Sequence, residues 1–104
     1  MTGMIVLISQ DGLVKKTPLD IRRAHRGDAG KTLTSGWVRM LWEPEDGKEH
    51  DLVILTNLGG VMRFPLSEIR PTGELARGVR VIRLQAYESV QDAILVEGEN
   101  EYSS

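Results

Sequence analysis

Hydrophobic residues along this chain occur in short runs that are separated by turn-forming residues. Residues 52–55 (Leu-Val-Ile-Leu) form one such run, which is too short for a helix and includes two β-branched side chains. Residues 57–60 (Asn-Leu-Gly-Gly) supply a turn, because glycine adopts positive φ without steric cost. Residues 61–64 return as a second run and end at Pro65, since proline cannot donate to a sheet ladder. The pattern predicts a β-hairpin that ends in a Pro-Leu-Ser corner.

The same pattern appears earlier in the chain, over residues 4–22. Gly12 corresponds to Gly59 at a separation of 47 residues (59 − 12), and Pro18-Leu19 corresponds to Pro65-Leu66. Two further matches follow, between residues 36–40 and 78–82 and between residues 51–55 and 92–96. Repeats of about this length are typical of propeller blades. The sequence therefore predicts two copies of one structural unit.

The remaining runs predict an all-β chain without a long amphipathic helix. Strands are expected over residues 4–9, 13–17, 37–42, 79–84 and 93–97, with an irregular, arginine-rich connection over residues 20–36. We predict two tandem, four-stranded antiparallel blades over residues 1–50 and 51–97, followed by an acidic tail over 98–104. The strand 93–97 stands where a third repeat would begin. It must pair back within the chain or be completed by another subunit, because an open strand edge invites association.

Composition narrows the functional classes. The chain has 104 residues, with 13 Lys and Arg against 15 Asp and Glu, so its net charge of −2 does not by itself indicate nucleic-acid binding. There is no cysteine for a disulfide or a zinc site, and His25 and His50 lack partners at ligand spacing. No apolar run approaches the roughly 20 residues of a membrane helix, and no basic segment precedes the first strand. A cytoplasmic protein without metal or cofactor is expected.

Residues 27–32 (Gly-Asp-Ala-Gly-Lys-Thr) end like a phosphate-binding P-loop. The motif requires an earlier glycine where His25 stands, and residues 33–36 are a poor start for the helix that should follow. No Ser, His and Asp arrangement suggests nucleophilic catalysis either. We therefore predict that the chain is not an enzyme.

Residues 51–84 resemble one blade of the C-terminal domain of the DNA gyrase and topoisomerase IV A subunits. The matching residues are Thr56, Gly59, Arg63, Gly73, Ala76, Gly78 and Val79, while Glu74 stands where that family usually has arginine. The resemblance covers nearly the whole chain as two blades. It implies a β-pinwheel module that binds and bends DNA on a basic rim. The first-blade box of gyrase is degraded here, since Asp28 and Ala29 interrupt its Gly and Arg pattern over residues 24–30.

The resemblance implies that cations repeated along the blades contact DNA phosphates rather than bases. Lys15 and Lys16 are adjacent on one strand, so at most one is expected to point inward. Arg22 with Arg70, and Lys16 with Arg63, occupy equivalent places in the two repeats. The candidates are Lys15, Lys16, Arg22, Arg23, Arg26, Lys31, Arg63, Arg70, Arg77 and Arg80, with Arg83 nearby. The alternative for all of them is an ordinary solvated surface.

Two functions remain open at this point. The first is largely nonspecific duplex-DNA binding by bending or wrapping. The second is a protein-interaction or oligomerisation module that has lost DNA wrapping, which the net charge, Glu74 and the degraded box favour. Two blades cannot close a disc, so we expect a homo-oligomer, most simply three chains that give six blades. Topoisomerase subunits are a further candidate partner.

Overall fold

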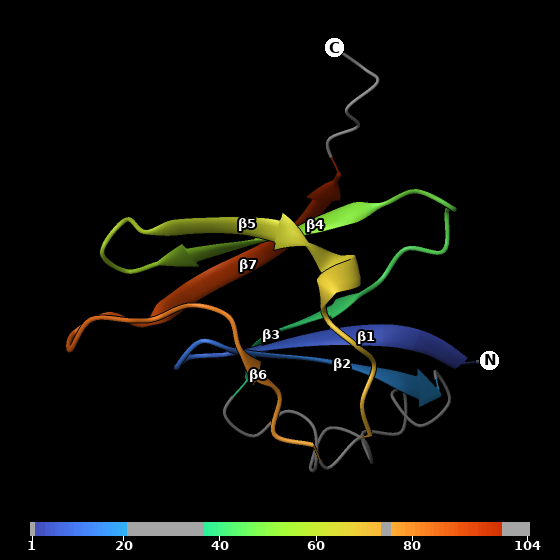
Figure 1. Cartoon of the computed structure of the whole chain (residues 1–104), viewed down its shortest axis with the longest axis horizontal. Coiled ribbons are helices and arrows are strands. Elements are labelled where there is room, and N and C mark those ends of the chain that lie inside the picture. Colours follow the sequence, from blue (N-terminus) through green and yellow to red (C-terminus); the bar gives the residue numbers. More distant parts are fainter. Residues whose placement is uncertain (1, 21–36, 74–75, 99–104) are drawn as a thin grey trace.

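The computed structural model describes residues 2–20, 37–73 and 76–98 as two packed antiparallel sheets. Its elements are β1 (Thr2–Ser9), β2 (Leu13–Asp20), β3 (Trp37–Trp42), β4 (His50–Thr56), β5 (Val61–Pro65), the 3₁₀ turn η1 (Leu66–Glu68), β6 (Val79–Arg80) and β7 (Val90–Glu97). Sheet A has the strand order β3-β1-β2-β6, and sheet B has the order β5-β4-β7. Figure 1 shows the two sheets as separate layers. The all-β prediction is confirmed.

The two hairpins, β1–β2 and β4–β5, have the same turn. Gly12 and Gly59 both have positive φ, at 91° and 83°, and each donates its N–H to a carbonyl three residues earlier at 3.2 Å. The Ser9 hydroxyl accepts the Leu13 N–H at 2.8 Å, as the Thr56 hydroxyl accepts the Gly60 N–H at 2.9 Å. Each first strand also has a bulge at its last residue against its third strand. The two sheets are therefore copies of one unit, as the repeat predicted.

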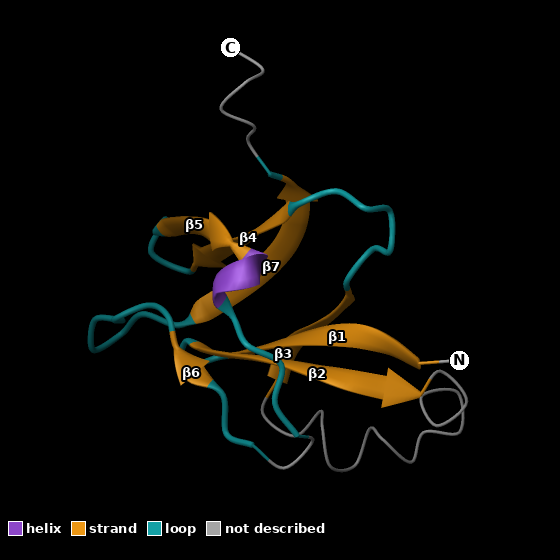
Figure 2. Ribbon diagram, turned by 45° about the vertical axis from the view of Figure 1, so that its right-hand side comes forward, coloured by secondary structure: helices purple, strands orange, loops and turns teal. Residues whose placement is uncertain are grey.

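The core lies between the two sheets. Sheet A contributes Val6, Ile8 and Val14, and sheet B contributes Leu52 and Ile54, all of them fully buried. The turn η1 adds further apolar area at the edge of this core, and Figure 2 shows it between the layers. Strands β1 and β4 carry near-continuous apolar runs, and each is paired with a strand on both sides. Burial of this area is the main stabilising term.

The two sheets do not meet with equivalent faces. By the repeat, Ile5 and Leu7 correspond to Leu52 and Ile54, while Val6 and Ile8 correspond to Val53 and Leu55. Val6 and Ile8 face the core in sheet A, whereas Leu52 and Ile54 face it in sheet B. The front of one unit thus packs on the back of the next. This head-to-tail stacking leaves the second unit with an outer face like the inner face of the first.

The boundary predicted between the blades is crossed by one strand. β6, from the second half of the sequence, pairs with β2 and becomes the fourth strand of sheet A. Sheet B has three strands in the described residues, so only one of the predicted four-stranded sheets is complete. β7 pairs along the whole of β4, and not as the start of a third repeat. The registers make β7, and not residues 78–82, the counterpart of β3.

Several strand limits also differ from those predicted. β2 continues through Pro18 to Asp20, because Pro18 lies at a position whose N–H would point away from β1, so no ladder bond is lost. The strand expected over 79–84 ends after Arg80, where the chain turns toward sheet B. β7 begins three residues before the expected start. The connection 21–36 lies outside the described residues.

Candidate nucleic-acid interface

Four arginines lie between η1 and β7, where the chain passes from sheet B to sheet A and back. This segment follows η1, runs beside β2 and includes β6. Its approach to β2 is fixed by a bond from the Thr72 N–H to the Lys16 carbonyl at 2.7 Å. The side chains in question are exposed: Arg70, Arg77, Arg80 and Arg83.

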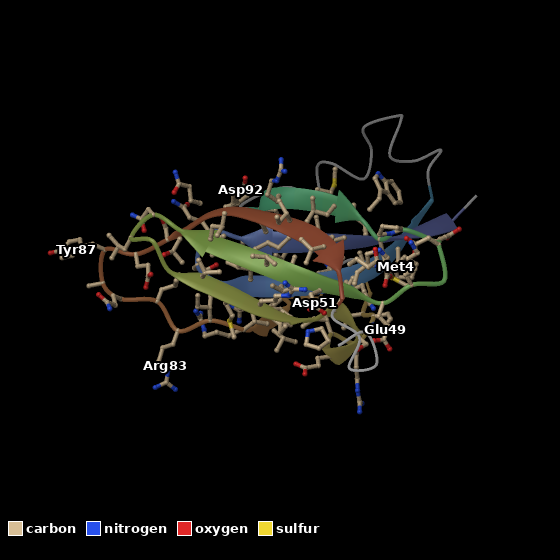
Figure 3. The ribbon with its side chains drawn as sticks, turned by 90° about the horizontal axis from the view of Figure 1, so that it is seen from above. Met4, Glu49, Asp51, Arg83, Tyr87 and Asp92 are labelled. Carbon is tan, nitrogen blue, oxygen red and sulfur yellow. The ribbon has the colours of Figure 1, made fainter. Side chains whose placement is uncertain are left out.

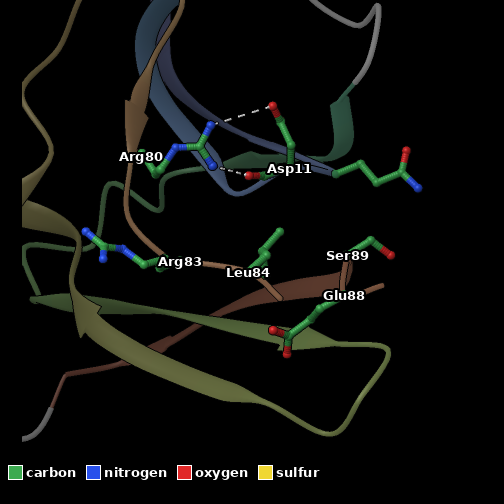
Figure 4. Close-up of a pocket in the computed structure, with 7 residues that line it drawn as sticks. Asp11, Arg80, Arg83, Leu84, Glu88 and Ser89 are labelled. Carbon is green, nitrogen blue, oxygen red and sulfur yellow. Dashed lines mark hydrogen bonds and ion pairs between the residues drawn. The ribbon is translucent and has the colours of Figure 1, made fainter. Parts of the chain in front are cut away.

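Arg80 is held in place by the first hairpin turn. It is opposite Leu13 in the ladder between β2 and β6, and its Nη1 donates to the Asp11 carbonyl at 2.7 Å. Its Nη2 lies 4.0 Å from the Asp11 carboxylate. Figure 4 shows these two contacts as dashed lines. Because the turn orients this guanidinium, Arg80 can present its remaining donors in one direction.

Arg83 lies on the rim of an open cleft of about 630 Å³ beside Arg80. The cleft is lined by Gln10, Asp11, Arg80, Arg83, Leu84, Glu88 and Ser89. Figure 3 shows Arg83 projecting away from the body of the molecule. Within the described residues, this side chain makes no hydrogen bond or ion pair. Its charge is therefore available to an external anion.

Two carboxylates in this cleft counteract its positive charge. The Ser9 hydroxyl donates to the Asp11 carboxylate and lowers its pKa below the usual value. The Thr56 hydroxyl donates to Glu88 at 2.7 Å, the Gln85 N–H adds a second bond, and together they lower the Glu88 pKa. Both groups are ionised at neutral pH. The cleft therefore has little net charge, and an anion is attracted to its arginine rim rather than to its floor.

Arg70 and Arg77 line a second, smaller hollow of about 150 Å³, together with Gly78 and Val14. Neither makes a hydrogen bond or an ion pair in the part of the chain that the structure describes. The positive charge of Arg77 contributes only slightly to the lowered pKa of the Asp11 carboxyl. Among the described residues, Arg70, Arg77 and Arg83 are thus the exposed arginines whose charges are not neutralised by contact.

Other predicted cations are placed less favourably. Lys15 and Lys16 are 2% and 8% exposed, so the expectation that only one points inward is wrong. They lie on opposite faces of β2, and both faces are covered there; the Lys16 Nζ is 3.8 Å from Glu43. The Arg63 Nε pairs with Asp51 at 2.8 Å. Arg22, Arg23, Arg26, Lys31 and the box over 24–30 lie outside the described residues.

Negative charge collects on a different connection. Residues 43–49, which join β3 to β4, contain four acidic residues and one lysine, and Asp51 follows at the start of β4. Figure 3 shows Glu49 and Asp51 in the half of the molecule away from Tyr87. Arg39, an exposed cation outside the predicted set, pairs with Asp92 at 2.8 Å. The acidic connection and the arginine-bearing segment are thus different parts of the chain.

No three His, Asp or Glu side chains in the described ranges gather into a candidate metal site. In the same ranges, no helix has the length and apolar character needed to cross a bilayer.

Comparison with known proteins assigns this sequence to a family. The sequence model of the family described as "DNA gyrase C-terminal domain, beta-propeller" matches residues 3–35 and 50–97. The two matched segments correspond to the two hairpin units.

Curated relatives agree with this match. The DNA gyrase A protein of Kosmotoga olearia is 31% identical over 94 residues, which cover 88% of this chain and 12% of that protein. The DNA gyrase A protein of Staphylococcus aureus (strain MRSA252) is 33% identical over 84 residues, which cover 77% of this chain and 10% of that protein. The chain thus spans about a tenth of the length of these relatives.

Proposed function

Because this chain belongs to the DNA gyrase C-terminal domain family, we propose that it is a non-catalytic module that binds duplex DNA without reading its sequence. The observation that carries the proposal is the arginine-bearing segment beside β2, where Arg70, Arg77 and Arg83 are exposed and unpaired within the described residues. Guanidinium groups suit phosphate oxygens, and such contacts position a protein on DNA without specifying bases.

The net charge of −2 does not oppose this proposal, because phosphate attraction depends on local charge. The acidic residues of the segment 43–49 lie on a different connection from the arginines. The predicted contacts of Arg22, Arg23, Arg26 and Lys31 belong to the same proposal, as does a cytoplasmic location.

Salt dependence of DNA affinity tests this proposal directly. Each phosphate contact adds about 0.9 to the slope of log K against log salt for B-DNA, so three contacts add about 2.7. We expect the triple variant Arg70→Ala, Arg77→Ala, Arg83→Ala to bind a fluorescent duplex more weakly and with a correspondingly flatter slope. Arg39→Ala is the matched control, since it removes an exposed arginine that Asp92 already neutralises. Equal losses in the triple variant and the control would contradict the proposal.

A second candidate function is self-association or protein interaction through the outer face of sheet B. This face exposes Leu55 at 36%, Val61 at 66% and Ile94 at 42%. Its counterpart in sheet A, which includes Val6 and Ile8, is buried against sheet B. A contact between chains that buries this face could close a ring, for which three chains giving six blades is the simplest form. A topoisomerase subunit is the other candidate occupant.

Sedimentation velocity over a range of concentrations tests this second candidate. We expect a concentration-dependent assembly that Ile94→Glu abolishes, because a carboxylate would be buried in the contact. Tyr87→Glu is a suitable control, since Tyr87 is 90% exposed on the loop before β7 and lies at one end of the molecule (Figure 3). A chain that stays monomeric at high concentration would exclude the ring.

A further inference from the structure

The outer edge of β2 shows how a hairpin of this kind accepts an added strand. Val14 is opposite Val79, and Leu13 is opposite Arg80, in the antiparallel ladder between β2 and β6. The Val81 N–H then donates to the Gly12 carbonyl at 3.1 Å. The added strand therefore docks mainly through backbone hydrogen bonds, as in β-augmentation.

Two glycines let this strand approach closely. Gly78 has φ of 98°, and a Cβ on it would lie 2.9 Å from the Val14 carbonyl oxygen. On the acceptor side, a Cβ on Gly12 would lie 2.8 Å from Cγ2 of Ile82 and 3.0 Å from its carbonyl oxygen. The donor is thus defined by a pattern: glycine, valine, a variable residue, valine and isoleucine, over residues 78–82.

The second hairpin has the same acceptor groups with nothing docked on them in the described ranges. Gly59 has the same positive φ as Gly12, yet a Cβ on it would meet no atom within 4 Å. Val14 pairs with Val79 on its outer side, whereas its counterpart Val61 pairs only with Leu55 of β4 among the described residues. Among the described residues, no strand lies on the outer side of β5.

The backbone of Val61 points toward this open side. The Gly60 carbonyl accepts the Thr56 N–H at 2.9 Å, so Gly60 bonds toward β4. Successive residues of a strand alternate in direction, so the N–H and C=O of Val61 point outward. These groups correspond to those that Val14 uses in its ladder with β6.

We propose that the outer edge of β5 is an acceptor site for an extended strand supplied by another polypeptide. This inference deepens the second proposal, on protein interaction, and does not depend on DNA binding. The partner follows the pattern of residues 78–82 but differs at its middle position. In the first hairpin that position is Arg80, which Asp11 binds through its carbonyl and carboxylate (Figure 4).

Leu58 determines which residue the β5 site prefers at the middle position of the added strand. It occupies the place of Asp11 in the second turn and is 56% exposed. A leucine supplies no carboxylate, and its exposed side chain would pack against an apolar residue of the partner. The β5 site therefore prefers an apolar residue where β6 has arginine. An arginine there would still reach the carbonyl but would lose its ionic contact.

Two synthetic peptides test this specificity with the isotopically labelled full chain. The first has the sequence of residues 76–84, and the second has the same sequence with Arg80→Met. The chain's own β6 is tethered at an effective concentration of about millimolar, so a dilute peptide cannot displace it from β2. We expect the second peptide to shift the amide signals of Leu58, Gly59 and Val61, and to bind about fivefold or more tightly than the first. Signals of Val14 should not move.

Two variants complete the test. Val61→Pro removes an outward N–H without removing a bond to β4, and we expect about tenfold weaker peptide binding with the amide spectrum of the rest of sheet B retained. Leu58→Asp should reverse the preference, so that the peptide with arginine binds more tightly. The proposal is overturned if neither peptide shifts these amides at millimolar concentration, or if β5 pairs only with β5 of another copy. It also fails if Leu58→Asp leaves the preference unchanged. Self-association that persists without peptide binding would remove this inference alone and leave the second proposal standing.

Discussion

Sheets A and B are two copies of one hairpin unit in different degrees of completion. Sheet A has four strands, and the residues Val6 and Ile8 on one of its faces are buried against sheet B. Sheet B repeats the same turn and the same bulge, but its equivalent residue Leu55 is partly exposed and the outer side of β5 carries no strand in the described residues. The difference shows that local sequence forms each hairpin, whereas a neighbouring unit supplies the fourth strand and covers the second face.

The largest difference in loss of stability is expected between Ile8 and Leu55, which occupy equivalent positions in the two repeats. Ile8 is fully buried and Leu55 is 36% exposed, although the repeat aligns them. Ile8→Ala should lower the free energy of unfolding by about 3 kcal/mol, because it leaves a cavity between the sheets. Leu55→Ala should lower it by less than about 1 kcal/mol. Urea denaturation measures both, and equal costs would show that the outer face of sheet B is covered in solution.

The turn glycines Gly12 and Gly59 allow the occupied edge of sheet A to be compared with the open edge of sheet B. Alanine at either position requires positive φ, which costs roughly 1 kcal/mol. At Gly12 the added Cβ also meets Ile82 at 2.8 Å, whereas at Gly59 it meets nothing within 4 Å. We expect Gly12→Ala to lose about 2 kcal/mol of stability or more and Gly59→Ala only about 1 kcal/mol. Thermal unfolding of both variants checks this, and a reversed order would contradict the assigned edge.

A smaller effect concerns the carboxylates bonded to the two turn hydroxyls. Thr56 donates to Glu88 and lowers its pKa, so the folded value lies below the unfolded one. The stabilising contribution is therefore present above the ordinary glutamate pKa and is lost as pH falls through the lowered folded value. Thr56→Val should move the Glu88 pKa up toward its usual value. NMR titration of the Glu88 side chain measures this, with the Asp11 pKa as the internal control, since Ser9 is intact.

The smallest effect on stability is expected for the unpaired arginines. Arg77→Ala should change the free energy of unfolding by less than about 0.5 kcal/mol, because it removes no ion pair in the described structure. Arg63→Ala should cost slightly more, up to about 1 kcal/mol, since Asp51 then loses its partner. Chemical denaturation of both variants checks the order. A larger loss for Arg77→Ala would assign that side chain a structural role rather than a binding role.

Much of the fold was predictable because it depends on local pattern. The short apolar runs, the glycines at the turns and the Pro-Leu corner before η1 each predicted an element that the structure contains. The exchange of β6 between the halves was not predictable, because matching Gly78 to Gly36 compares sequences and says nothing about which edge a strand joins. The pairing of β7 with β4 was not predictable either, because the sequence match of residues 92–96 to 51–55 does not show which strand they join.

The candidate site was predictable only as a set of cations. Sequence alone does not distinguish Arg39, which pairs with Asp92 from a distant strand, from Arg77, which does not pair in the described residues. Strand alternation also predicts one inward lysine of Lys15 and Lys16, whereas both faces of β2 are covered at these positions. Exposure and ion pairing depend on how the sheets stack, which no single repeat encodes.

Amide hydrogen exchange at Val14 and Val61 tests most directly whether sheet B is an incomplete copy of sheet A. The two residues occupy the same place in their hairpins, and one lies in the ladder with β6 while the other lies at the open edge. We predict that the Val14 amide exchanges only through large-scale opening, whereas the Val61 amide exchanges at close to the rate of an unstructured peptide. Equal protection of the two amides in the isolated chain would contradict this difference between the sheets.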